Sequence, residues 1–288
     1  MIIIDYSAIA ISSVFSQSKS GKIEESFLRH TILNSLRMYN LKYRDKYGKM
    51  IIACDGGSWR KDYYSQYKAA RRKNREESTM DWKEIFRIVN SIKAEIDEHL
   101  PYTVIQTDKA EADDVIAALV SATQEFGNHE PVMIVSADKD FIQLQRYDNV
   151  SQWSTMTKKL ITDKNPSRYL LEHILKGDSG DGVPNVLSGD NTFTDGIRQT
   201  PLRAAKIDEW IAAQKAGTLQ SVMPEETYRN YIRNRTVIDL ECVPSTIRDA
   251  ILTQYAAAPV KNNSKILNYL IANRCNILIS CASEFFTK

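Results

Sequence analysis

The stretch Thr107–Tyr147, TDKAEADDVIAALVSATQEFGNHEPVMIVSADKDFIQLQRY, decides the fold. It holds two acidic clusters, Glu111–Asp114 and Asp138–Asp140. Apolar residues from Val115 onward fall at helical spacing, so the first cluster opens a helix, where negative side chains meet the positive end of the helix dipole. Pro131–Val135 is a short continuous apolar run, which is typical of a buried parallel strand. The second cluster therefore follows the carboxyl end of a strand, where ligands of open α/β sheets collect.

This concentration of carboxylates predicts a divalent metal site, because carboxylates at one sheet edge repel one another unless cations lie between them. Two other apolar runs end in the same way. Ile2–Ile4 leads to Asp5, and the run that begins at Met50 leads to Asp55. Taken alone, Asp5 could instead cap the helix that follows it. Three strands that each bring an aspartate to one edge favour the metal site.

Alternating strand and helix patterns predict an α/β protein with a central, mostly parallel sheet flanked by helices. Further core elements are expected as helices at 27–39 and 78–100, a strand at 102–106, and one or two edge strands within 150–161. Beyond these, helices are expected from about residue 169, at 200–214, at 228–237 and within 267–279. We therefore predict two domains, a core over residues 1–165 and a helical subdomain over 166–288.

Composition excludes several classes of protein. The 288 residues are 43% hydrophobic and 26% charged, which is ordinary for a soluble globular protein. The net charge of +2 gives no evidence for or against nucleic acid. Four cysteines form no CxxC pair, so reduced thiols in a cytosolic protein are expected. The apolar start lacks a basic flank and is interrupted by Asp5, so no signal peptide is predicted, and no stretch is long enough to span a membrane.

The segment Trp59–Arg75 mixes basic and aromatic residues directly after Asp55. Its members are Arg60, Lys61, Lys68, Arg71, Arg72, Lys73 and Arg75, with Trp59, Tyr63, Tyr64 and Tyr67. Cations neutralise phosphates, and aromatic rings stack on unpaired bases. The alternative is a solvated helix face, as for many charge runs. Basic residues next to an acidic cluster favour a metal-dependent enzyme that acts on a polyanion.

Two further aspartates follow the helix expected from residue 169. Asp178 and Asp181 lie in a glycine-rich turn after Gly177, which stops the helix. Such a turn is ordinarily only a turn, but here it adds two carboxylates to the set. The histidines are scattered and predict no catalytic grouping; they are His30, His99, His129 and His173.

The order of these motifs resembles the flap endonuclease/5′-nuclease family, most closely its T-even bacteriophage type of ribonuclease H. The motifs that carry the resemblance are IIIDYS (2–7), ACDGG (53–57), YKAAR (67–71), EADD (111–114), SADKDF (136–141) and LKGDSGDGVPN (175–185). They cover almost the whole chain, and their joint order and spacing are highly specific. The resemblance implies a PIN-like 5′-nuclease core, with a helical arch at about 56–80 through which a single-stranded 5′ end passes.

The resemblance also implies roles for individual residues. The first metal ion, or its water shell, would be held by Asp5, Asp55, Glu111, Asp113 and Asp138. The second ion would be held, mostly through waters, by Asp140, Asp178 and Asp181, and Asp114 would lie behind these ligands. Lys68 and Arg71 would contact the scissile phosphate, and Tyr67 would stack on a base near the cut. Other nucleic-acid contacts are expected from Arg60, Lys61, Arg72, Lys73, Arg75 and Thr200.

One departure concerns the helix–turn–helix module that binds duplex in this family. Its usual sequence, close to GVPGIGPKTA, begins here at Val183–Asn185 and is then interrupted by residues 186–195. We expect Thr200 to fill the helix-entry position after the interruption and the duplex-binding role to be kept. The interruption argues against the potassium ion that this module holds in the family. A Phe285–Phe286 doublet near the end of the sequence is a candidate sliding-clamp peptide.

The function implied is that of a Mg²⁺-dependent structure-specific 5′ nuclease with two metal ions, for which Mn²⁺ could substitute. Expected substrates are DNA and RNA/DNA hybrids with 5′ flaps or forks. We expect the protein to act as a monomer that removes RNA primers during phage replication in the host cytoplasm. Candidate partners are a sliding clamp or a single-stranded-DNA-binding protein. A haloacid-dehalogenase-type phosphatase is disfavoured because that chemistry needs an aspartate where Ser7 stands. A non-catalytic binder of branched DNA and a PIN-type ribonuclease are the alternatives.

Overall fold

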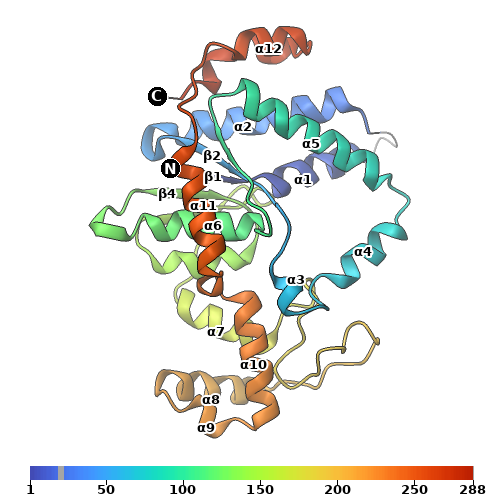
Figure 1. The fold of residues 1–288 in the computed structure, drawn as a ribbon, viewed down its shortest axis with the longest axis vertical. Coiled ribbons are helices and arrows are strands. Elements are labelled where there is room, and N and C mark those ends of the chain that lie inside the picture. The colour runs from blue at the N-terminus through green and yellow to red at the C-terminus, as the bar shows by residue number, and fades with distance from the viewer. Residues whose placement is uncertain (19–22, 288) are drawn as a thin grey trace.

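The central sheet has six strands in the order β3-β2-β1-β4-β5-β6. Figure 1 labels three of them, β2, β1 and β4, which lie side by side among the helices. The computed structural model describes residues 1–18 and 23–287, with the side chains of 18 and 72–74 excepted. The strands are β1 (Ile2–Asp5), β2 (Met50–Ala53), β3 (Thr103–Ile105), β4 (Val132–Val135), β5 (Val150–Trp153) and β6 (Leu160–Ile161). The first five run parallel, and β6 pairs antiparallel with β5. The predicted α/β fold is confirmed.

Strands β1, β2 and β4 are buried at every position, which explains why their sequences are continuous apolar runs. Ile2 and Ile4 face one core cluster and Ile3 faces the other, because successive side chains of a strand point to opposite faces. The chain order reverses between β1 and β4, and this reversal opens a crevice at the carboxyl ends of the two strands. Asp5 and the second acidic cluster lie at that crevice.

Helices cover both faces of the sheet. Residues of α1 (Tyr6–Ser18), α2 (Glu25–Tyr47) and α5 (Trp82–His99) contribute to the cluster that contains Ile2 and Ile4. Residues of α6 (Ala112–Ala122) and α11 (Ser245–Ala257) contribute to the opposite cluster. Short 3₁₀ helices cover residues Glu125–Gly127 (η1), Lys139–Arg146 (η2) and Leu240–Cys242 (η3).

A third core joins the helices that follow the sheet. It includes residues of α7 (Pro166–Lys176), α8 (Ala204–Lys215), α9 (Leu219–Val222) and α10 (Glu225–Ile238). Tyr64 and Tyr67, from the basic segment between α3 (Arg60–Tyr63) and α4 (Ala69–Glu76), also belong to this core. The basic segment is thus packed, through these two tyrosines, against the core formed by helices α7 to α10.

The chain beyond α10 returns to the sheet. Besides α11, the elements α12 (Ile266–Ala272), α13 (Asn276–Ile279) and η4 (Ala282–Phe285) pack on the α2 side, at the opposite end of the molecule from α8 and α9 (Figure 1). Phe285 is fully buried in this core and Phe286 is partly exposed. The expected clamp-binding peptide is therefore wrong for this doublet, because its first ring is not available to a partner.

Several predicted boundaries differ from the structure. The helix expected at 78–100 begins at Trp82, because the Asp81 side chain accepts from Glu84 N and caps it. The helix expected from Thr200 begins at Ala204. Helix α1 was not predicted, because its serines interrupt the apolar pattern; in the structure the Ser13 hydroxyl donates to Ile9 O instead of seeking water. Among the helices of the described residues, none has the length and apolar character to cross a membrane.

Candidate active site

The carboxyl edge of β1, β2 and β4 borders a cavity of about 320 Å³. Its charged lining residues are Asp5, Asp55, Glu111, Asp113, Asp138 and Asp181, with Lys61, Lys68, Arg71 and Arg75. Six of the eight predicted metal ligands therefore share one cavity with four of the predicted basic residues. The remaining two, Asp140 and Asp178, line a neighbouring cavity of about 820 Å³ that also includes Asp5 and Asp138.

Asp5 is held rigidly at the end of β1. Its Oδ1 accepts from Ala8 N at 3.0 Å, and its Oδ2 accepts from the Ser136 hydroxyl at 2.8 Å. Burial raises the pKa of Asp5 to about 6, although these hydrogen bonds oppose the shift. Asp5 both caps the helix that follows it and lines the cavity, so the two interpretations offered by the sequence are compatible.

Asp55 is held by residues at the starts of α6 and α1. Its Oδ1 accepts from Ala112 N at 2.9 Å, and its Oδ2 accepts from the Ser7 hydroxyl at 2.6 Å. The next residue must be glycine, because a Cβ on Gly56 would lie 2.0 Å from Thr107 O. This close approach ties the end of β2 to the start of α6. It brings Asp55 beside the first acidic cluster.

Asp113 has the most unfavourable environment of the cluster. Burial raises the pKa of its carboxyl well above the ordinary value, and the carboxylates of Asp138, Asp5 and Glu111 raise it further, against the opposing effect of Lys68. Crowded carboxylates of this kind are stabilised by cations. The chemistry of the oxygen donors therefore fits a divalent ion.

Glu111 joins the acidic cluster to the basic segment. Its backbone N donates to Asp114 Oδ2 at 2.9 Å in a capping box at the start of α6. Its Oε1 lies 2.6 Å from Lys68 Nζ, and its Oε2 lies 3.0 Å from the Tyr67 hydroxyl. Burial tends to raise the pKa of Glu111, but Lys68 and Arg60 outweigh it and lower the pKa.

Arg60 was predicted to contact nucleic acid, and this prediction is wrong for the structure described. The side chain is 2% exposed. Its guanidinium Nη1 lies 3.0 Å from Glu111 Oε2 and 3.1 Å from Asp114 Oδ2, and its Nε donates to Val237 O at 2.8 Å. Arg60 thus ties α3 to α6 and α10. Nothing in the sequence separated it from its exposed basic neighbours.

Lys68 and Arg71 lie over the turn that carries Asp181. Lys68 N donates to Asp181 O at 2.7 Å, and Lys68 Nζ lies 3.5 Å from Asp181 Oδ2. Arg71 pairs with the same carboxylate and donates through Nε to Gly180 O. Burial works against charging Lys68, but Asp181 and Glu111 outweigh it and raise the Lys68 pKa. Both cations therefore line the carboxylate cavity.

Tyr67 does not present its ring to the solvent. It is 4% exposed, and its hydroxyl lies 3.0 Å from both Glu111 Oε2 and Asp181 Oδ2, donating to one of them. Burial raises the pKa of this phenol, so it keeps its proton. The predicted stacking on a base is wrong for this conformation, because the ring is part of the third core.

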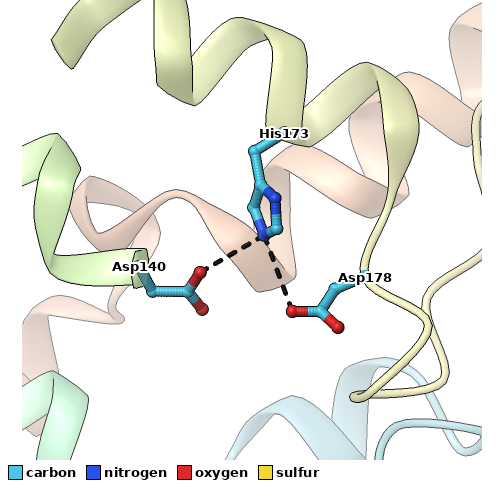
Figure 2. A group of neighbouring side chains, drawn as sticks. All are labelled: Asp140, His173 and Asp178. Atoms are coloured by element: carbon cyan, nitrogen blue, oxygen red, sulfur yellow. Dashed lines mark ion pairs between the residues drawn. The ribbon is translucent and has the colours of Figure 1, made fainter. Parts of the chain in front are cut away.

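His173 is a site residue that the sequence interpretation missed. Its Nε2 lies 3.2 Å from Asp140 Oδ1 and 3.6 Å from Asp178 Oδ2 (Figure 2). Burial lowers the pKa of the imidazole, but the two carboxylates outweigh burial and raise it to about 10. The expectation that the histidines form no grouping is therefore wrong for His173. Its position one helical turn before Gly177, which leads into the acidic turn, was the available signal.

The remaining predicted contacts have mixed outcomes. Lys61 and Arg75 are exposed and line the carboxylate cavity. The side chains of Arg72 and Lys73 lie outside the described residues. Thr200 lies in the loop before α8, where its N donates to the Ser188 hydroxyl at 3.0 Å. Its predicted helix-entry role is wrong, since Arg203 takes that position.

Two protein-family models match the chain. Residues 1–170 match the family model described as 5′-3′ exonuclease, N-terminal resolvase-like domain. The chain belongs to the 5′-3′ exonuclease family. Residues 166–285 match the model described as T4 RNase H, C terminal. The resemblance inferred from the sequence motifs is thereby confirmed.

Similarity to individual proteins is consistent with this family membership. The chain is 35% identical to the ribonuclease H of Enterobacteria phage T4, over 98% of this chain and 95% of that protein. It is 33% identical to the flap endonuclease Xni of Shewanella woodyi, over 51% and 57% of the two chains. Among solved structures, the T5 5′-exonuclease with bound zinc has a TM-score of 0.59 at 15% identity, covering 89% of this chain and 97% of that chain. The last comparison shows the shared fold.

Family membership gives the general activity. The protein is a structure-specific 5′ nuclease and a metal-dependent phosphodiester hydrolase. The alternative of a non-catalytic binder of branched DNA is therefore wrong. The match of the C-terminal half to the T4 RNase H model also argues against a PIN-type ribonuclease, which lacks such a half.

Proposed function

We propose that this nuclease cleaves near 5′ ends, flaps and forks with two Mg²⁺ ions, for which Mn²⁺ can substitute. The observation that carries the proposal is the convergence of Asp5, Asp55, Glu111, Asp113 and Asp138 on one cavity opposite Lys68 and Arg71. Hard oxygen donors suit Mg²⁺. In the proposal these five acids hold the first ion or its waters, and Asp140, Asp178 and Asp181 serve the second.

When bound, the two ions supply an activated water and stabilise charge on the phosphoryl and leaving oxygens. The chain's own cations complete the site. Lys68 is held 2.6 Å from Glu111 Oε1, so it already faces the place where a phosphate would lie between the acids and the basic segment. Preorganised cations at developing negative charge lower the barrier without reorganising during the reaction. Lys68 and Arg71 are therefore assigned to the scissile phosphate.

The relatives support the proposed substrate class. The phage T4 relative is named a ribonuclease H, and a T5 flap endonuclease of the same fold has been solved as a pseudo-enzyme-product complex with DNA and metal ions (TM-score 0.59, 17% identity). We assign both DNA flaps and RNA/DNA hybrids to this protein, acting as a monomer. Primer removal in phage replication, in the host cytoplasm and beside a clamp or single-stranded-DNA-binding protein, is the corresponding biological role.

The decisive experiment offers labelled 5′-flap DNA and an RNA·DNA hybrid to the purified protein, with Mg²⁺ and with Mg²⁺ plus chelator. We expect cleavage with Mg²⁺ only, leaving 5′-phosphate and 3′-hydroxyl ends. Asp113→Asn and Asp138→Asn should abolish cleavage and leave DNA binding intact. Cleavage at the wild-type rate by either variant contradicts the metal assignment, and cleavage of neither substrate contradicts the proposed function.

A further inference from the structure

Three potential ligand atoms converge beside the carboxylate cavity, each from a different element. Asp140 lies in η2, His173 in the last turn of α7, and Asp178 in the turn after Gly177 (Figure 2). One oxygen or nitrogen atom of each side chain lies within 4.8 Å of the other two. The cluster is thus a candidate metal site that includes a nitrogen donor.

The spacing fits a coordinated ion. Neighbouring ligands of an octahedral ion with bonds of about 2.1 Å lie about 3.0 Å apart, and those of a tetrahedral ion with bonds of about 2.0 Å lie about 3.3 Å apart. Nε2 of His173 lies 3.2 Å from the Asp140 oxygen and 3.6 Å from the Asp178 oxygen. The two carboxylate oxygens lie within 4.8 Å of each other, so all three ligand atoms can face one ion placed between them.

The His173 Nε2 atom is also left without a hydrogen-bond partner. It is buried, and although two carboxylates face it, neither accepts a hydrogen bond of proper geometry from it. In Figure 2 this nitrogen faces the gap between the two carboxylates. A buried nitrogen aimed between two acids, with a hydrogen bond to neither, is the arrangement expected of a ligand without its ion.

The surrounding chain holds these ligands in place. Asp178 Oδ1 accepts from Gly180 N at 2.7 Å and from Asp181 N at 3.1 Å, which leaves Oδ2 directed at His173. The backbone at Gly177 packs closely against the segment at Val183, since a Cβ at Gly177 would lie 2.4 Å from Val183 O. The imidazole stacks on Tyr169 with ring centroids 6.0 Å apart and planes 10° from parallel. Preorganised ligands of this kind favour metal affinity.

We propose that His173 binds the second ion directly through Nε2, together with Asp140 and Asp178, and that this site therefore prefers a divalent transition metal such as Mn²⁺ to Mg²⁺. Imidazole is a good ligand for transition metals, whereas Mg²⁺ favours oxygen. The proposal rests on the proposed two-metal function for the presence of an ion at this cluster. It goes further by giving that ion a nitrogen ligand and a metal preference.

The rival interpretation makes His173 a resident cation that only neutralises Asp140 and Asp178. The two interpretations differ in a direct spectroscopic property. Mn²⁺ bound to imidazole shows ¹⁴N modulation in pulsed electron paramagnetic resonance, and this becomes ¹⁵N modulation when the protein is made with ¹⁵N-histidine. A protonated imidazole beside a water-bound ion gives no such coordinated-nitrogen signal.

The experiment measures this signal on the full chain loaded with two equivalents of Mn²⁺. We expect nitrogen modulation in the wild type and in His30→Gln, a control on α2, and its loss in His173→Gln. His173→Glu should restore binding through oxygen, without the nitrogen signal. Calorimetric titration should show the preference for Mn²⁺ over Mg²⁺ falling about tenfold or more in both His173 variants. Thermal unfolding of each variant checks that it is folded.

The outcomes separate this proposal from the proposed function. A wild-type protein that binds Mn²⁺ without nitrogen modulation, a signal that persists in His173→Gln, or an unchanged metal preference would each overturn the role of His173. If wild-type cleavage of flap DNA with Mg²⁺ is intact at the same time, only the His173 proposal fails. A wild type that binds no Mn²⁺ and cleaves with no metal overturns both.

Discussion

Buried groups of opposite charge lie in direct contact in this site, and Lys68 is the clearest case. Its Nζ lies 2.6 Å from Glu111 Oε1 and 3.5 Å from Asp181 Oδ2, and its side chain is 15% exposed. A cation held this close to both acidic groups is also positioned to attract a negatively charged group, such as a phosphate, that enters the cavity. Lys61 lines the same cavity but is exposed.

Replacing Lys68 by Ala should therefore reduce kcat by about 10²–10³ while the affinity of the metal-free protein for DNA changes little, since the lost interaction acts mainly in the transition state. Single-turnover cleavage of a 5′-flap substrate, with DNA binding measured separately in the presence of chelator, gives both quantities. Lys61→Ala is the matched comparison and should weaken binding with little effect on kcat. A Lys68→Ala enzyme with full kcat would remove this residue from the scissile phosphate.

The raised pKa of Asp5 predicts a pH dependence of stability for the metal-free protein. Its carboxyl titrates at about 6 when folded against an ordinary value of 3.8, because burial opposes the charge. A group with a raised folded pKa contributes stability that is fully present below about pH 4 and is lost as the pH rises through about 6. The loss is on the order of 3 kcal/mol at neutral pH.

Urea unfolding of metal-free wild type and Asp5→Asn between pH 4 and pH 7 tests this dependence. The variant keeps a side chain of the same shape and cannot ionise, so it should become the more stable of the two as the pH rises. A stability difference that does not change over this range would show that Asp5 is not strained by its burial.

Among the elements, the junction of α3, α6 and α10 determines where the basic segment begins. Arg60 makes this junction through Glu111, Asp114 and the Val237 carbonyl. Breaking a buried ion pair by removing one partner leaves the other charge uncompensated. The consequence concerns folding as well as catalysis, because Glu111 is also a predicted metal ligand.

Arg60→Leu should lower the free energy of unfolding by about 3–5 kcal/mol. Chemical denaturation in the presence of chelator measures the change, and Lys61→Leu, one residue along and exposed, should cost under about 1 kcal/mol. Equal effects of the two substitutions would contradict the buried junction.

The same elements mark what the sequence could and could not predict. Strands β1, β2 and β4 were predictable because a strand buried on both faces has a continuous apolar sequence, and the acids after them indicated the site. Burial of Arg60 and Tyr67 was not predictable, because the residues that they contact lie more than forty positions away in the sequence. Arg60 pairs with Asp114 in α6, and Tyr67 contacts Asp181 in the acidic turn. The grouping of His173 with Asp140 likewise depends on α7 packing against η2.

At the scale of the whole molecule, the cavity is a meeting point of three cores. The ends of β1 and β2 lead to Asp5 and Asp55, the start of α6 carries Glu111 and Asp113, and the helices of the third core support the turn at Asp181. An ion bound there links parts of the chain that fold around different cores. The metal should therefore stabilise the molecule as a unit.

Adding Mg²⁺ at about 100 times its dissociation constant should raise the free energy of unfolding by about 2.7 kcal/mol for each site filled. Calorimetry with and without chelator measures the resulting rise in melting temperature. Asp113→Asn should unfold at a higher temperature than wild type without metal and gain less from Mg²⁺, because crowding of charge is relieved in advance. An Mg²⁺ effect of equal size in both proteins would contradict the site.

The contact between Lys68 and Glu111 has a thermodynamic consequence for the two ligands of the enzyme. An ion that takes Glu111 Oε1 frees the ammonium for a phosphate, and a phosphate that draws the ammonium away frees the carboxylate for an ion. Binding of the metal must then raise the affinity for DNA, and binding of DNA must raise the affinity for the metal by the same factor. Ca²⁺ titrations with and without flap DNA should give this shared factor, and Lys68→Ala should bring it close to one.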